Sequence, residues 1–116
     1  MRLDRIAEDT FIFTSDLYAQ VTSTVLLTPD GAIVFDTMPF PEETRQIISF
    51  IEDKLGGNSV RYVINSHYHP DHVYGNFMFE GAEIIAHEQC RQLLARFGQA
   101  SLEQAKRNSE ALAEVE

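Results

Sequence analysis

The sequence of 116 residues has one cysteine, two lysines and no tryptophan, and acidic residues outnumber basic residues 18 to 9. A single cysteine excludes an intramolecular disulfide framework and a cysteine-rich structural zinc module. The shortage of basic residues disfavours a nucleic-acid or anionic membrane surface as partner, because phosphate binding requires clustered Lys and Arg. No apolar run approaches the roughly 20 residues of a membrane span, and no signal peptide is recognisable. We therefore expect a cytoplasmic protein.

The composition is that of a folded domain. Hydrophobic residues make up 44% of the chain and charged residues 23%, which is ordinary for a globular protein. The length accommodates one compact domain at most. The composition alone thus predicts one small, acidic domain with enough apolar surface for a core.

The order of the expected elements indicates an α/β layered fold. A turn at Pro29–Gly31 predicts a hairpin, and Pro41 is a favourable first residue for a helix. The continuous apolar run at 32–35 predicts a strand covered on both faces, and the acidic residues at 42, 43, 52 and 53 predict a solvated helix face. Strands are expected at 10–14, 20–28, 32–35, 60–64 and 82–86, and helices at 41–55, 88–97 and 101–115.

One segment concentrates chemically active side chains. Three of the four histidines lie within residues 67–72 (HYHPDH), directly after the expected strand at 60–64. The carboxyl end of such a strand is a common place for a site in α/β folds. In an extended stretch His67 and His69 project to the same side and can reach one metal ion. Asp71 and His72, at the start of a short helix, diverge and can address different atoms or a second metal.

The residue types in this histidine segment (67–72) suit metal-assisted hydrolysis. Imidazole and carboxylate ligands favour zinc, and also accept iron or manganese. A catalytic zinc takes about three protein ligands and leaves one position for water, whose pKa falls to near 7. Asp71 could bind a second ion or accept the proton of that water. The segment therefore predicts a metal site made by His67, His69, Asp71 and His72.

The histidine segment matches the H-x-H-x-D-H signature of the metallo-beta-lactamase superfamily, and nearly the whole chain resembles the N-terminal half of that family. Residues 73–88 are similar to its widely distributed metallo-hydrolase members. The resemblance implies half of an αββα sandwich, with a mixed, mostly antiparallel sheet and flanking helices. Residues 1–116 would then be the N-terminal part of a single domain, truncated.

The resemblance also implies roles for single residues. His67 and His69 would bind the first metal, and Asp71 and His72 the second. Asp36, at the end of an early strand, would support the metal loop by hydrogen bonds from behind the ligands, an arrangement that orients ligands and tunes the metal.

The remaining family ligands are missing from the sequence. The family takes a third histidine, an aspartate and a further histidine from its second half, whereas His87 is the only histidine after His72 and no aspartate follows. We expect His87 to be a capping or packing residue rather than a ligand. Cys90 falls in an apolar helical pattern, which favours a buried, inert thiol.

These observations lead to one principal hypothesis and two alternatives. The principal hypothesis is a hydrolase with one or two zinc ions, in which a metal-bound hydroxide attacks an ester, thioester, lactam or phosphoester of a small-molecule substrate. The first alternative is a catalytically incomplete half-domain that binds metal weakly or acts only as a homodimer or with a complementary second half. The second alternative is a mononuclear iron thiol dioxygenase, since such enzymes share the signature.

Overall fold

The computed structural model describes residues 1–17, 20–57, 59–66, 73–93, 95–96, 99 and 102–103. Six strands form one sheet, in which the order in space follows the order in sequence. The first four strands pair antiparallel, and the last three of the six run parallel to one another. This confirms the α/β class and the mixed, mostly antiparallel sheet. The strands are β1 (Arg2–Ala7), β2 (Thr10–Thr14), β3 (Thr22–Thr28), β4 (Gly31–Phe35), β5 (Val60–Asn65) and β6 (Glu83–Ala86).

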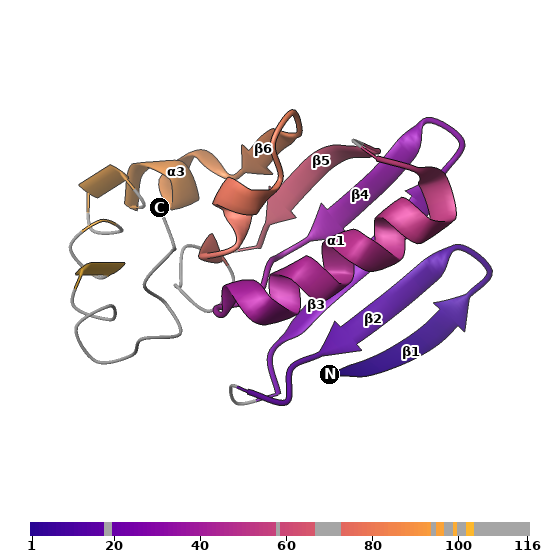
Figure 1. The fold of residues 1–116 in the computed structure, drawn as a ribbon. Helices are drawn as coiled ribbons and strands as arrows, with labels where there is room; N and C mark the ends of the chain where they lie inside the picture. Colours follow the sequence, from indigo (N-terminus) through magenta and orange to yellow (C-terminus); the bar gives the residue numbers. More distant parts are fainter. Residues whose placement is uncertain are drawn as a thin grey trace.

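Helix α1 (Pro41–Leu55) lies across one face of the sheet (Figure 1). Pro41 is its first residue, as expected, and Gly56 ends it with a φ of +92°. Ile47 and Ile51 of α1 are fully buried, and they belong to one core cluster with side chains of β2 to β5. The hydrophobic stripe of α1 thus covers the centre of the sheet and makes the core.

Two short helices complete the described fold. The 3-10 helix η1 (Asn76–Met78) follows the histidine segment, and α3 (Glu88–Leu93) follows β6. The helix expected at 88–97 is therefore confirmed at its start, and the helix expected at 101–115 lies almost entirely outside the described residues.

The sheet face opposite α1 is apolar and only partly covered. Phe35 is 39% exposed and Ile85 is 43% exposed, and Ile33 is half-buried. The expectation that the strand at 32–35 is covered on both faces is therefore wrong for the described structure. The strand register places a set of side chains on this open face: Ile12, Leu26, Ile33, Phe35, Tyr62, Ile64 and Ile85.

β1 is an edge strand that the sequence pattern did not predict. All six of its residues are exposed, and Arg2 forms an ion pair with Asp4 at 2.8 Å. Charged side chains on an edge strand protect it from pairing with other chains. β1 therefore extends the sheet without adding to the core.

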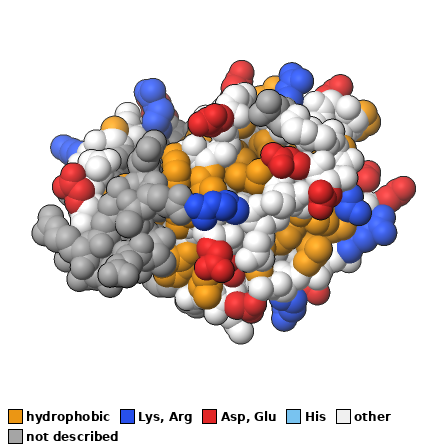
Figure 2. Space-filling model, viewed as in Figure 1, with side chains coloured by type: hydrophobic (Ala, Val, Ile, Leu, Met, Phe, Trp, Pro, Cys, Tyr) orange, Lys and Arg blue, Asp and Glu red, His pale blue; other side chains and the backbone are white. Residues whose placement is uncertain are grey.

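The face that carries α1 has a mixed, charged surface. Figure 2 shows acidic and basic side chains interspersed there, with hydrophobic atoms between them. Dispersed charge of both signs is typical of a surface in contact with solvent. Within the part of the chain that the structure describes, no helix is long and apolar enough to cross a membrane.

Candidate metal centre

The histidine segment begins where the parallel strands β4 and β5 end side by side. Asp36 follows β4 and Ser66 follows β5, so both lie at the carboxyl edge of the sheet. The predicted ligands His67, His69, Asp71 and His72 lie outside the described residues. Among the described residues, no group of three or more His, Cys, Asp or Glu could hold a metal ion. The structure therefore defines the residues that flank the predicted centre.

Asp36 fastens the N-terminal flank of the histidine segment. Its carboxylate accepts hydrogen bonds from the backbone N–H of Ser66 at 2.7 Å and from the Ser66 hydroxyl at 2.6 Å. The backbone of Asp36 is held in turn, because its N–H donates to the carbonyl of Ile64 and its carbonyl accepts from Ser23.

The backbone of Asp36 is itself unusual. Its φ is +64°, a left-handed conformation that costs free energy for residues other than glycine and that Asp and Asn tolerate best. Such strain is common at functional sites. The structure thus places Asp36 against the start of the histidine segment, and its effect on the metal ligands stays a prediction.

Thr37 fastens the C-terminal flank. Its hydroxyl accepts a hydrogen bond from the backbone N–H of Gly75 at 2.9 Å, and its side chain is fully buried. Two consecutive residues, Asp36 and Thr37, therefore hold the chain on both sides of the histidine segment.

A third contact joins the two flanks directly. The Asn65 amide N–H donates to the Asn76 amide oxygen at 3.1 Å, and the Asn76 amide N–H donates back to Asn65 at 2.8 Å. Asn65 is only 3% exposed. The sequence analysis missed this pair, although an asparagine at the end of the apolar strand β5 is a signal for a polar partner nearby.

The sequence analysis misassigned Glu43. It is 1% exposed, so the prediction of a solvated helix face is wrong at this position. Its carboxylate accepts a hydrogen bond from the Ser15 hydroxyl and another from the backbone N–H of Asp16 at 3.0 Å. Ser15 and Asp16 follow β2, whose end lies at the same edge of the sheet as Asp36. Glu43 thus connects α1 to the loop after β2.

His87 and Cys90 have structural roles, as the sequence predicts. The Nδ1 atom of His87 accepts a hydrogen bond from the backbone N–H of Gln89 at 3.1 Å, which caps the start of α3. Cys90 is 6% exposed, and its burial, assisted by the negative charge of Asp36, raises the pKa of the thiol. A thiol with a raised pKa is a poor nucleophile at neutral pH.

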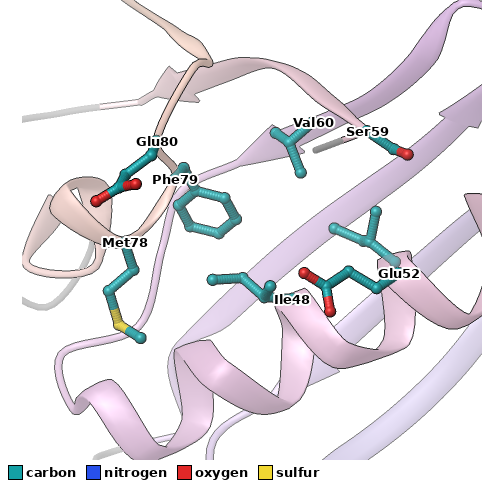
Figure 3. Close-up of a pocket in the computed structure, with 8 residues that line it drawn as sticks. Ile48, Glu52, Ser59, Val60, Met78, Phe79 and Glu80 are labelled. Carbon is teal, nitrogen blue, oxygen red and sulfur yellow. The ribbon is translucent and has the colours of Figure 1, made fainter. Parts of the chain in front are cut away.

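A shallow cavity lies at the opposite end of β5 from the histidine segment (Figure 3). Its volume is about 510 Å³ when the space at its open mouth is included. In Figure 3 the Glu52 side chain extends from α1 into the cavity, and its carboxylate lies beside Ile48. The cavity is lined by Ile48, Ile51, Glu52, Ser59, Val60, Met78, Phe79 and Glu80. Ser59 and Val60 place one side of the cavity at the amino end of β5.

Comparisons with known proteins identify the architecture. A family model described as the metallo-beta-lactamase superfamily matches residues 18–111. A HARLDQ-motif mutant of a metallo-beta-lactamase from Cronobacter sakazakii is 27% identical with a TM-score of 0.67, over 84% of this chain and 39% of that chain. A metallo-beta-lactamase from Hirschia baltica is 18% identical with a TM-score of 0.69, over 84% of this chain and 48% of that chain. One from Pontibacter korlensis is 22% identical with a TM-score of 0.67, over 82% of this chain and 47% of that chain.

The chain covers less than half of each of these solved structures. The chain spans 39% to 48% of the length of these three solved structures. A comparison with curated proteins finds no match. Nothing in these comparisons supports the iron thiol dioxygenase alternative.

Proposed function

Because the chain belongs to the metallo-beta-lactamase superfamily, we propose that it provides a metal centre for hydrolysis of a small-molecule substrate. The observation that carries the proposal is that hydrogen bonds hold both flanks of the histidine segment. Asp36 and Thr37 hold its two flanks, and Asn65 and Asn76 join them. A loop whose two flanks are hydrogen-bonded to residues at the end of a sheet is a suitable support for metal ligands, which need fixed positions.

The residues of the histidine segment fit zinc. His67 and His69 would hold one ion, and Asp71 and His72 would hold a second ion or the proton of the reacting water. Zinc, when bound, supplies a nucleophile at neutral pH by lowering the pKa of its water to near 7. Iron or manganese would accept the same donor types.

The residues that flank the histidine segment would contribute to this chemistry by positioning the metal ligands. Asp36 would orient the start of the segment through Ser66, since its carboxylate accepts hydrogen bonds from the backbone N–H and from the hydroxyl of that residue. Partners of this kind, behind the ligands, typically change metal affinity about 10–100-fold when removed. The substrate would be an ester, thioester, lactam or phosphoester.

The test measures bound zinc by elemental analysis in three purified proteins: the unaltered chain, His67→Ala and His87→Ala. We expect bound zinc in the unaltered chain and in His87→Ala, because His87 caps α3, and a marked loss in His67→Ala. Absence of zinc from the unaltered chain, or equal zinc in all three proteins, would contradict the proposal. Hydrolysis of chromogenic ester, thioester, lactam and phosphoester substrates, each with and without chelator, would then identify the bond that is cleaved.

A second candidate function is that of a half-domain completed by association. The open face favours it, because the apolar side chains of Phe35 and Ile85 remain 39% and 43% exposed. A second copy or a complementary half would cover this face and supply further ligands. Chelator-sensitive hydrolysis by the monomeric chain would contradict this candidate.

A further inference from the structure

We infer that Asn65 and Asn76 form an amide clamp that sets the metal affinity of the histidine segment. The inference rests on the proposed function and assigns positioning roles to two residues outside the ligand set. The clamp consists of two opposed hydrogen bonds, at 3.1 and 2.8 Å, between side chains eleven residues apart. It lies between the flanks of the segment and thus closes them into one loop.

The clamp can affect metal affinity because of its position in the fold. Asn65 is the last residue of β5, and Asn76 is the first residue of η1. The Asp36 carboxylate accepts a hydrogen bond from the backbone N–H of Ser66, and the Thr37 hydroxyl accepts one from the backbone N–H of Gly75. These contacts hold the neighbouring residues on the same two flanks. The clamp therefore fixes the distance between the two points at which the segment leaves and rejoins the described fold.

The chemistry of the pair is specific. Each amide uses its oxygen as acceptor and one N–H as donor, so the pair is satisfied only when both partners are amides in this opposed arrangement. Burial of Asn65, which is 3% exposed, strengthens the hydrogen bonds and makes a lost partner costly. The pair therefore favours one separation of the flanks over others.

A fixed separation lowers the cost of metal binding. A loop whose ends are free must lose conformational entropy when several of its side chains bind one ion, whereas a loop with fixed ends has lost part of that entropy on folding. The clamp would thus contribute to metal affinity without contacting the metal. Loss of either asparagine removes both hydrogen bonds, so the two substitutions should not have additive effects.

The experiment titrates the metal-free chain with Co²⁺ and follows the visible absorption of the bound ion. We expect Asn76→Ala to weaken Co²⁺ binding by about tenfold or more, in the range of other partners behind the ligands. Asn65→Ala should have a similar effect, and the double variant should bind no more weakly than the weaker single variant. Asn76→Leu, which keeps a similar volume, adds no charge and makes neither hydrogen bond, replaces Asn76→Ala if that variant does not fold.

Ser59→Ala is the matched control. The Ser59 hydroxyl donates to the carbonyl oxygens of Leu55 and Gly56 at the other end of β5, far along the strand from the segment. If the pair were purely structural, its loss would lower the free energy of unfolding of the metal-free chain and leave the Co²⁺ dissociation constant unchanged. Ser59→Ala should also leave that dissociation constant unchanged. An unchanged dissociation constant in the asparagine variants would overturn the clamp, whereas absence of Co²⁺ binding by the unaltered chain would overturn the proposed function.

Discussion

The backbone N–H of Gly75 donates a hydrogen bond to the Thr37 hydroxyl at 2.9 Å, in a contact that only glycine permits. A β-carbon at position 75 would lie 2.8 Å from the Thr37 β-carbon and 2.6 Å from Thr44 Oγ1. Both threonine side chains are fully buried and cannot move aside freely. The chain after the histidine segment therefore approaches the strand-end residues closely because position 75 lacks a side chain.

Gly75→Ala should lower the free energy of unfolding by about 1–3 kcal/mol, the usual cost of added volume in a packed interior. Urea unfolding of the metal-free chain measures it. Gly57→Ala is the matched control, since a β-carbon there has no heavy atom within 4 Å. It should change stability by no more than about 0.5 kcal/mol. Equal effects of the two substitutions would show that the close approach at Gly75 is not a constraint.

Asp36 combines two separable effects, its carboxylate bonds to Ser66 and its φ of +64°. Asp36→Ala loses the bonds and retains the strain, and should destabilise the fold by about 1–3 kcal/mol. Asp36→Gly loses the bonds and relieves the strain, so it should be about 1 kcal/mol more stable than Asp36→Ala. Parallel urea titrations compare the two. If glycine is no better than alanine, the backbone at this residue is not strained.

Glu43 and its neighbour Glu42 should contribute differently to stability, because the Glu43 carboxylate is buried. Glu43→Ala removes the acceptor of the Ser15 hydroxyl and of the Asp16 N–H, and should destabilise the fold by about 1–3 kcal/mol. Glu42→Ala, on the exposed side of the same helical turn, should cost no more than about 0.5 kcal/mol. Thermal unfolding of both variants decides this. Similar midpoints would mean that Glu43 contributes no more than a solvated acid.

The sequence predicted most of the sheet and the first helix because their signals are local. The turn at Pro29–Gly31 and the first helical residue Pro41 both occur where expected, since proline and glycine constrain the backbone directly. β1 was not predicted, because its six exposed residues mix charge with apolar side chains and carry no core-facing pattern. An edge strand of this kind is selected by pairing with β2 rather than by its own propensity.

The ligand set of the candidate site stays a prediction, and the residues that flank it were only partly predictable. The ligand types of the histidine segment can be identified by spacing, whereas the partners of Asn65 and Glu43 depend on contacts eleven and 28 positions away along the chain. Glu43 in particular lies in a helical acidic run whose local pattern indicates solvent. The contact with Ser15, which arises from tertiary packing, overrides that pattern.

Cys90 should resist thiol reagents in the folded chain. Its side chain is 6% exposed, and burial raises the pKa of the thiol. Labelling with a thiol reagent at pH 8 should be at least about tenfold slower in buffer than in denaturant, because only the thiolate reacts. The raised pKa also predicts that stability decreases as the pH rises through the thiol pKa of the unfolded chain, about 8.5, since the unfolded state then releases its proton first. Equal labelling rates in the two solvents would contradict the burial.

The open face predicts association of the chain with a partner surface. Burial of one large aliphatic side chain contributes about 1.5–3 kcal/mol, so a face with several such side chains gains strongly from being covered. Sedimentation velocity over a range of concentrations should show a self-association that Ile85→Lys weakens by about tenfold or more. Ile85 is 43% exposed on the open face, so a charge there would be buried on association without a partner.

Leu55→Lys provides the control for this experiment, because Leu55 is 39% exposed at the end of α1 and lies away from the open face. Leu55→Lys removes about as much exposed hydrophobic surface as Ile85→Lys does, but it leaves the open face unchanged. It should therefore leave the self-association unchanged. Equal weakening by both substitutions would indicate nonspecific aggregation. A chain that stays monomeric at all concentrations and binds no hydrophobic dye would show that the open face does not drive association, and would remove the observation that favours the half-domain as a second function.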